Sequence, residues 1–413
     1  MTGVPPGEET KALVDGFNLA SLPPAFYDDP FPVYAALQSL SPVHELPGGG
    51  LFLTRWEDLR TVYQQSALFS SDKKAAFRPV FGDTLLYQHH TTSLVFNDPP
   101  LHTRVRRLVA GALTSRAIAP MESTLDHLLD ELLDRAQALG TIDAIDDFAA
   151  AIPIEIIASL MKIPPGERQP LRGWSLAILS ALEPNPSEAM KQDAENAVRD
   201  FLAYLKTLIG DRRRRPLDPD SDLLTRLIRG TGIRDGLTEI ELLQNCIFIL
   251  NAGHETTTNL VGNGLHLLLT RRPARDLLLQ RPEVIKTAVE EVLRFASPNQ
   301  LGNRVSTDDT TLGGRPVPAG TQITLCIGAA NRDPAQFKNP NDFDVIRTPN
   351  RHLAFISGPH MCAGQHLARL EGQLALARFF QRFPHAELAG EPVRGKRARF
   401  RGFSSLPVEL IPG

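Results

Sequence analysis

A cysteine in a short turn-forming loop is the residue of this 413-residue chain that is best placed to do chemistry. Cys362 has a glycine on either side, at Gly358 and Gly364, and a basic residue, His360, two positions before it. An apolar helical pattern begins directly after the loop, at Leu367. A thiolate at the N-terminus of a helix is stabilised by backbone N–H groups and by the helix dipole. We therefore expect Cys362 to act as a ligand.

The loop around this cysteine suits a flat partner. Glycine lets a planar ligand approach the backbone closely, because it has no side chain. A thiolate in such a setting fits the axial position of haem iron, where it donates electron density that favours O–O cleavage. The alternative is an inert, buried cysteine beside an ordinary turn, which is the commoner case for a lone cysteine. The neighbouring glycines and the histidine favour the haem ligand.

A second informative segment, 238–270, reads as one long buried helix. Thr238 and Glu241 have the spacing of a capping box, and Arg271, Arg272 and Pro273 supply the stop. The segment is apolar nearly all round, which is typical of a core helix. At about 1.5 Å per residue it would span roughly 50 Å, enough to cross a whole domain.

Polar residues interrupt this helix in its middle, at 252–258. The hydroxyl of Thr256 can compete for the carbonyl of Ala252 and open the hydrogen-bond ladder locally. A polar break in a buried helix costs free energy, so it indicates a functional site. The alternative is a kinked helix whose threonines are satisfied internally. A zinc helix of the H-E-x-x-H type is excluded, because Thr258 stands in place of the second histidine.

The remaining patterns predict a mainly α fold with a small β region, in a single domain spanning 1–413 with no fused reductase. Residues 101–295 are mostly helical by period. The run 212–215 before Pro216 is typical of a solvated helix end. Other elements are a strand at 51–54, a helix at 56–65, a helix at 283–295, a β-meander over 301–328 with turns at 313–314 and 318–320, and a final hairpin at 397–411.

Bulk properties exclude several classes of function. The net charge is −3 and the isoelectric point about 6.4, which argues against nucleic acid or an anionic membrane as partner. The cysteines Cys246, Cys326 and Cys362 are few and far apart, so we expect a reducing, cytoplasmic setting. Residues 1–20 contain no apolar run, which predicts neither a signal peptide nor a membrane anchor. No Gly-rich nucleotide loop follows a strand, so if the chain uses haem to activate oxygen, its electrons come from a separate protein.

The cysteine loop closely resembles the haem-binding signature of the cytochrome P450 family, F-G-x-G-x-(H/R)-x-C-x-G. Its matching residues are Phe355, Gly358, His360, Cys362 and Gly364. One position departs, since Ile356 stands where the family usually has glycine. The resemblance implies haem b, with Cys362 as the iron ligand, and it extends over nearly the whole chain.

The polar segment of the long helix resembles the family's oxygen-binding motif, (A/G)-G-x-(D/E)-T. On that resemblance, Ala252 and Gly253 let the helix lie against the porphyrin. Thr256 is implied to hydrogen-bond dioxygen, and Glu255 to help pass protons inward.

Further residues match the family's structural positions. His102, Arg106, Arg304 and His360 are implied to bind the haem propionates, although each alone is more often a plain surface charge.

Glu291 and Arg294 resemble the family's buried E-x-x-R ion pair, where the alternative is a surface pair. Arg347 is the expected third partner of this pair, with His352 as second choice.

The resemblance implies a monooxygenase that inserts one oxygen atom from O₂ into a small hydrophobic substrate, by hydroxylation, demethylation or epoxidation. Electrons would come from a ferredoxin that docks near Arg104 and Arg107, so NAD(P)H would contribute only through redox partners. A peroxide-driven haem-thiolate peroxygenase and a non-catalytic haem sensor are the alternatives. The presence of both Glu255 and Thr256 argues against each of them.

The substrate pocket is expected to be mainly apolar, with His89, His90, Ser93 and Arg399 as polar candidates. The expected substrate is a mid-sized hydrophobic molecule, with a carboxylate or a hydroxyl as its optional polar group. By resemblance it is lined by His89, His90, Leu94, Phe96, Leu250, Leu301 and Phe400.

Overall fold

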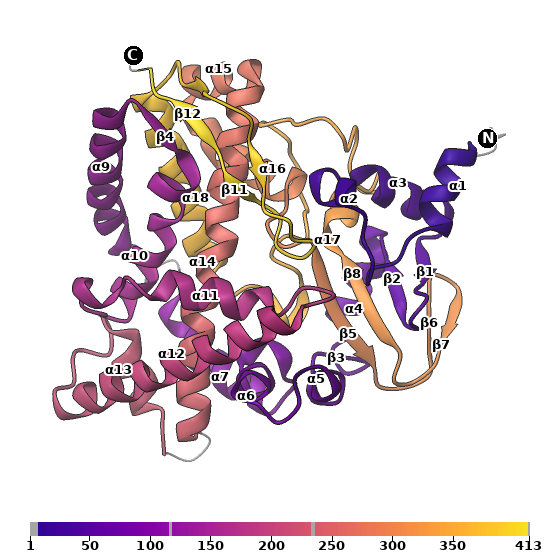
Figure 1. Cartoon of the computed structure of the whole chain (residues 1–413), viewed down its shortest axis with the longest axis horizontal. Helices are drawn as coiled ribbons and strands as arrows, with labels where there is room; N and C mark the ends of the chain where they lie inside the picture. Colours follow the sequence, from indigo (N-terminus) through magenta and orange to yellow (C-terminus); the bar gives the residue numbers. More distant parts are fainter. Residues whose placement is uncertain (1–6, 115–117, 233–235, 412–413) are drawn as a thin grey trace.

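A helix of 32 residues, α14 (Glu239–Thr270), runs through the middle of the molecule (Figure 1). The structure is a computed structural model that describes residues 7–114, 118–232 and 236–411. The predicted capping box is present, since the backbone N–H of Thr238 donates to Glu241 Oε2 at 2.8 Å and that of Glu241 donates to Thr238 Oγ1 at 3.2 Å. This reciprocal cap satisfies two N–H groups at the start of the helix.

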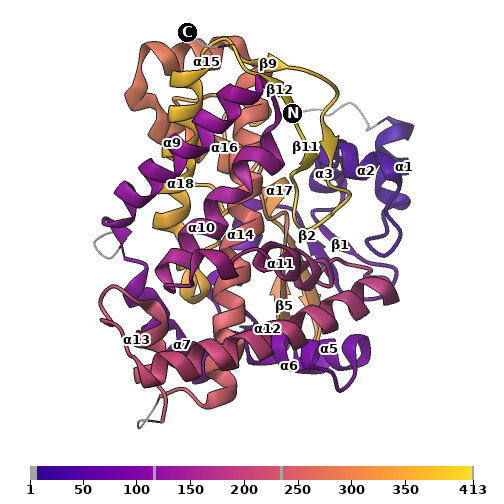
Figure 2. The ribbon, with the colours of Figure 1, turned by 60° about the vertical axis from the view of Figure 1, so that its left-hand side comes forward.

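The other helices pack around α14, and the expected mainly α fold is confirmed. Figure 2 shows α11 and α12 lying across α14, and both contact it, as do α10, α16 and α18. The helices are α1 (Glu8–Asp15), α2 (Pro24–Asp28), α3 (Phe31–Leu40), α4 (Trp56–Gln64), α5 (Lys74–Phe81), α6 (Leu85–Thr92), α7 (Leu101–Ala112), α9 (Met121–Leu139), α10 (Ala151–Leu160), α11 (Leu171–Ser180), α12 (Glu188–Arg214), α13 (Leu223–Arg229), α15 (Arg272–Gln280), α16 (Ile285–Phe295), α17 (Ile327–Ala330) and α18 (Gln365–Arg382). Short 3₁₀ or π turns are η1 (Leu94–Phe96), η2 (Ala144–Ala149), η3 (Pro165–Glu167), η4 (Pro282–Val284) and η5 (Gly358–His360).

The main sheet lies on the opposite side of the molecule from α9 and α10 (Figure 1). Its strand order is β1-β2-β8-β5-β3, with β2 and β8 parallel and the other neighbours antiparallel. The strands are β1 (Val43–Glu45), β2 (Leu51–Leu53), β3 (Phe69–Ser70), β4 (Thr141–Asp143), β5 (Leu301–Ser306), β6 (Thr310–Leu312), β7 (Arg315–Val317), β8 (Gln322–Cys326), β9 (Glu387–Leu388), β10 (Val393–Arg394), β11 (Phe403–Ser405) and β12 (Pro407–Glu409). The strand and helix predicted at 51–54 and 56–65 correspond to β2 and α4.

Two predicted strand arrangements are wrong. In place of a meander over 301–328, β5 pairs directly with β8, and β6 and β7 pair with each other as a separate hairpin. The final hairpin at 397–411 does not form either, because β11 pairs with β10 while β12 pairs with β4 and β9. A single residue, the buried Leu406, separates β11 from β12, and one residue is too short for a hairpin turn.

The arginine run at 212–215 is only partly solvated, which corrects the prediction of a wholly solvated helix end. Helix α12 does end there, at Arg214. Arg212, however, is buried, forms an ion pair with Asp222 and donates to the carbonyl of Lys162 at 3.0 Å. Its charge therefore fixes the end of α12 against α13.

Over the described residues, no helix is both long and apolar enough to cross a membrane.

Candidate active site

A cavity of about 350 Å³ lies between α14 and the loop that carries Cys362, and residues of both line it. Helices α6, α10 and α11 and strand β5 supply further walls, which are mainly apolar. Most residues predicted for a substrate pocket lie here, namely His89, His90, Ser93, Leu94, Phe96, Leu301, Arg399 and Phe400. Leu250 does not line the cavity. It is buried in the core, while Phe248, Ile249 and Asn251 of the same helix line the cavity in its place.

The cysteine loop is held by its own backbone hydrogen bonds. The N–H of Cys362 donates to the carbonyl of Phe355 at 3.0 Å, and the N–H of Ile356 donates to that of Leu353 at 2.8 Å. Gly358 has a φ of +73°, and a Cβ there would lie 2.3 Å from the carbonyl oxygen of Tyr63, so only glycine fits. The loop is thus tied to the end of α4, and its thiol lines the cavity.

Two opposing effects act on this thiol. Burial raises the pKa of Cys362, while the backbone N–H of Gly364 and the guanidinium groups of Arg106 and Arg369 lower it. A positively charged partner bound at the sulfur would add to the lowering effects and favour the thiolate.

Four basic side chains gather at one end of the cavity without a carboxylate partner. His102, Arg106, Arg304 and His360 all line it, and the rings of His102 and His360 lie 4.0 Å apart. Within the described residues, no ion pair neutralises any of the four, and the Nε2 atoms of both histidines are buried without a hydrogen-bond partner. Burial, Arg304, His102 and Arg106 together lower the pKa of His360 to about 2. A dianionic group would satisfy this end of the cavity.

These features fit haem. Its two propionates match the four basic groups, and Cys362 would hold its iron. Of these groups, Arg106 and Arg304 donate only to the backbone carbonyls of Met361 and Asn303 in the described part of the chain. On the opposite wall, a Cβ added to Gly253 would meet no atom within 4 Å, so the α14 backbone presents open space to a flat ligand. Phe355, Ala252 and Gly364, which the sequence predicted as cofactor contacts, line the same cavity.

The polar residues of α14 divide between the cavity and the core behind it. Thr256 lines the cavity, and its Oγ1 donates to the carbonyl of Ala252 at 2.9 Å, the backbone contact expected from the sequence. The helix is nevertheless continuous through 252–258, so the expected local opening of the ladder is absent from α14.

Glu255 is buried one residue before this threonine and does not line the cavity. Its two carboxylate oxygens accept from Arg397 Nη1 at 2.5 and 2.6 Å, and Arg397 Nη2 donates to the carbonyl of Leu176 at 3.1 Å. Burial raises the pKa of Glu255 to about 7, although Arg397 offsets part of that rise. This arginine could not be predicted as a partner of Glu255, because it lies 142 residues away along the chain.

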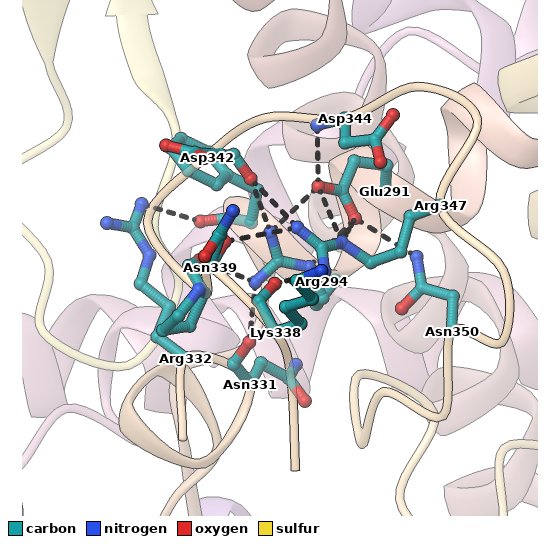
Figure 3. A network of polar contacts seen from close by, with 12 residues as sticks. Glu291, Arg294, Asn331, Arg332, Lys338, Asn339, Asp342, Asp344, Arg347 and Asn350 are labelled. Atoms are coloured by element: carbon teal, nitrogen blue, oxygen red, sulfur yellow. Dashed lines mark hydrogen bonds and ion pairs between the residues drawn. The ribbon is translucent and has the colours of Figure 1, made fainter. Parts of the chain in front are cut away.

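A network of buried charges lies beside the segment that leads to the cysteine loop (Figure 3). Arg294 and Glu291 of α16 are fully buried and joined by two hydrogen bonds of 2.7 and 2.8 Å. Arg347 donates its Nε to both oxygens of Glu291, at 3.1 and 3.2 Å, and so takes the place of third partner. Arg294 also donates to the backbone carbonyls of Asn331, Pro340 and Asp342. His352, the second choice for third partner, instead contacts Glu290.

The two arginines predicted to receive a redox partner differ in their surroundings. Arg104 forms an ion pair with Glu241 of α14, whereas Arg107 is exposed.

Sequence reasoning missed two buried residues near the cavities. Glu371 of α18 lines the main cavity, and Lys73, just before α5, lines a second one beside it.

This chain is similar to known proteins both in sequence and in fold. Residues 275–409 match the family described as Cytochrome P450. The chain is 33% identical to a protein named "Biotin biosynthesis cytochrome P450" from Bacillus subtilis (strain 168), over 93% of this chain and 96% of that protein. It is also 33% identical to 6-deoxyerythronolide B hydroxylase from Saccharopolyspora erythraea, over 94% and 97%. A solved structure of P450BioI in complex with hexadec-9Z-enoic acid ligated acyl carrier protein superposes with a TM-score of 0.87 at 31% identity, covering 94% of this chain and 99% of that one.

Proposed function

The chain belongs to the cytochrome P450 family of monooxygenases, and we propose that it inserts one oxygen atom from O₂ into a small hydrophobic organic substrate beside Cys362. The observation that carries the proposal is one apolar cavity whose wall holds a loop thiol at one point and four basic groups at another, two of them histidines whose Nε2 atoms have no hydrogen-bond partner. Hydroxylation is the reaction that we favour, with demethylation and epoxidation as variants of the same chemistry.

The side chains that line this cavity indicate which residues would hold the cofactor. Cys362 would be the axial ligand of haem b, and Arg106, Arg304, His102 and His360 would bind its propionates. When bound, the haem supplies the activation of O₂.

Thr256 and Glu255 would supply hydrogen bonds and protons. Thr256 places its hydroxyl at the cavity wall, where it can donate to or accept from a ligand in the cavity. Glu255 stands behind it, and a carboxyl whose pKa is about 7 can both hold and release a proton near neutral pH. Arg397 holds that carboxyl in place, so proton transfer from Glu255 would require the ion pair to loosen.

Electrons would come from a ferredoxin and its reductase, and NAD(P)H would contribute only through them. The exposed Arg107 on α7 supports docking of an acidic partner on this face. Arg104, on the same helix, forms an ion pair with Glu241. We also propose a reducing, cytoplasmic location, since Cys246, Cys326 and Cys362 are all free thiols.

The test compares two ways of driving the haem-loaded protein. One reaction contains ¹⁸O₂, NADPH, a ferredoxin and its reductase, and the other contains hydrogen peroxide alone, each with the same panel of apolar compounds. We expect products that carry one ¹⁸O atom in the first reaction and far less product in the second. Thr256→Ala should divert the electrons to peroxide or water, while Thr256→Ser should restore much of the coupling.

Other outcomes would support the alternatives. Efficient turnover with peroxide alone would indicate a peroxygenase, and ligand binding without product in either reaction would indicate a sensor. Unchanged coupling in Thr256→Ala would remove that threonine from the mechanism.

A further inference from the structure

A second cavity, of about 320 Å³, adjoins the one that carries Cys362. The two share five wall residues, namely Phe96, Leu182, Leu301, Asn303 and Arg399. The second cavity lies between α5, the segment that follows α11, and strands β5 and β8. A ligand longer than the main cavity could therefore extend past Arg399 into this space.

The second cavity contains a buried lysine that lacks a partner. Lys73 lines it, only 3% of the residue is exposed, and its Nζ has no hydrogen-bond partner. The carboxylates that act on its pKa, Asp98 and Asp72, are already engaged. Asp98 accepts from the side chain of Ser70 and the backbone of Ser71, and Asp72 accepts from Lys74 at 2.6 Å. A buried ammonium group without a partner is costly, because it has lost its hydration.

The other charges around this lysine do not neutralise it. Burial, Arg304 and Arg399 together lower the pKa of Lys73 to about 7, and Asp98 and Asp72 offset only part of that fall. Arg399 is satisfied, since it donates to two backbone carbonyls and to Asn303 Oδ1. Glu183, the acid in the cavity wall, accepts from the backbone N–H groups of Ala398 and Arg399 through Oε2, while its Oε1 is buried and has no hydrogen-bond partner among the described residues. It is not among the charges that act on the pKa of Lys73. The Lys73 end of the cavity thus holds an amine that has no hydrogen-bond partner, and a bound anion would favour its protonated form.

The haem does not need this lysine. The four basic side chains that line the main cavity already match its two propionates, and Lys73 does not line that cavity. Lys73 is therefore a basic group that the haem does not need, in a cavity that adjoins the one lined by Cys362.

We propose that Lys73 binds the carboxylate of the substrate, and that this enzyme acts on amphiphilic organic acids. The apolar part of such an acid would extend from the second cavity, along Phe96 and Leu301, toward Cys362. A carboxylate at Lys73 would give the ammonium a charge-assisted hydrogen bond in place of its lost hydration. The oxidation of the apolar end rests on the proposed function, whereas the binding of the acid does not.

The test is an equilibrium titration of the haem-loaded ferric protein, followed by its absorption spectrum. The probes are dodecanoic acid and dodecan-1-ol, which differ in charge but share their chain. We expect the wild-type protein to bind the acid about tenfold to 100-fold more tightly than the alcohol. Lys73→Gln should lose this preference and keep its affinity for the alcohol, while Lys73→Arg should restore part of it.

Lys206→Gln is the matched control. It removes the same charge from an exposed lysine of α12 that lines neither cavity, and it should keep the preference for the acid. Equal binding of acid and alcohol by the wild type, failure of the acid to bind, or a preference that survives in Lys73→Gln would each overturn the proposal. Loss of haem from Lys73→Gln would overturn it too, by assigning the lysine to a propionate. Because the titration needs neither O₂ nor turnover, its result is independent of the monooxygenase test.

Discussion

Ile356 is the residue at which this chain departs from its family's loop, and the structure shows the consequence. Its φ is +52°, in the left-handed region that a β-branched residue seldom adopts. Its side chain is half-buried and packs against the core beside α4 and the main sheet. Glycine would adopt this φ without strain, which explains why it is usual at this position. Here, packing of the isoleucine side chain offsets the backbone strain.

This account predicts an order of stability for two small substitutions. Ile356→Gly and Ile356→Ala both remove the packed side chain, but only alanine keeps a Cβ in the left-handed region. We expect Ile356→Gly to be more stable than Ile356→Ala by about 1 kcal/mol in urea unfolding of the holoprotein. A more stable alanine variant would show that the loop does not hold this φ in solution.

At the scale of the elements, the buried charges of α16 fasten the segment 331–350 to the helical core. Glu291 is fully buried and joins two arginines, so its loss would leave both without a counter-charge. We expect Glu291→Ala to lower the free energy of unfolding by about 3–5 kcal/mol. Glu57→Ala is the control, because Glu57 and Arg60 form a pair with the same spacing on an exposed face of α4. Glu57→Ala should lower the free energy of unfolding by less than about 1 kcal/mol. Equal losses of stability in the two variants would refute the structural role of the buried pair.

The contact between α14 and α18 predicts a pH dependence of stability. Burial raises the pKa of Glu371 to about 8, and a hydrogen bond with Thr257 offsets part of that rise. In the unfolded chain the same group loses its proton near its ordinary pKa of 4.5. Between these two values the folded protein holds one proton more than the unfolded chain. The free energy of unfolding therefore falls as pH rises through this window, by up to about 1.4 kcal/mol per pH unit.

The variant Glu371→Gln removes this titration but keeps the shape of the side chain. Its stability should fall less than that of the wild type between about pH 5 and 8, as measured by urea unfolding at a series of pH values. The pKa of Glu255 is also raised, so this residue adds the same pH dependence of stability to both proteins up to about pH 7. Parallel curves for the two proteins up to pH 8 would show that Glu371 is ionised in the folded state.

At the scale of the whole molecule, features set by neighbouring residues could be predicted from the sequence, and features set by distant pairs could not. The capping box of α14 and the glycines of the cysteine loop are local, and the structure has both. The pairing of β5 with β8 and the ion pair between Glu255 and Arg397 depend on segments that meet only after folding. The buried position of Lys73 could not be predicted either, because a single lysine near a turn is usually exposed.

The surface charge of the folded molecule predicts how the electron donor docks. Arg107→Glu should slow reduction by a ferredoxin roughly threefold to tenfold at low ionic strength and less at high ionic strength, because salt screens the steering charge. Arg199→Glu, on α12, makes the same change at another exposed arginine and should have little effect. Stopped-flow reduction rates measure both variants. Equal rates for Arg107→Glu and the wild type at low salt would place the docking surface elsewhere.

The central claim is that Cys362 supplies a thiolate to haem iron. The absorption spectrum of the reduced, carbon-monoxide-bound holoprotein tests it most directly, because the position of its main band reports the axial ligand. We expect the thiolate-type band in the wild type and in Cys246→Ser and Cys326→Ser, whose cysteines are buried in the core away from the cavity. The band should be lost in Cys362→Ser. A thiolate-type band that persists in Cys362→Ser, or that is missing from the wild type, would contradict the account.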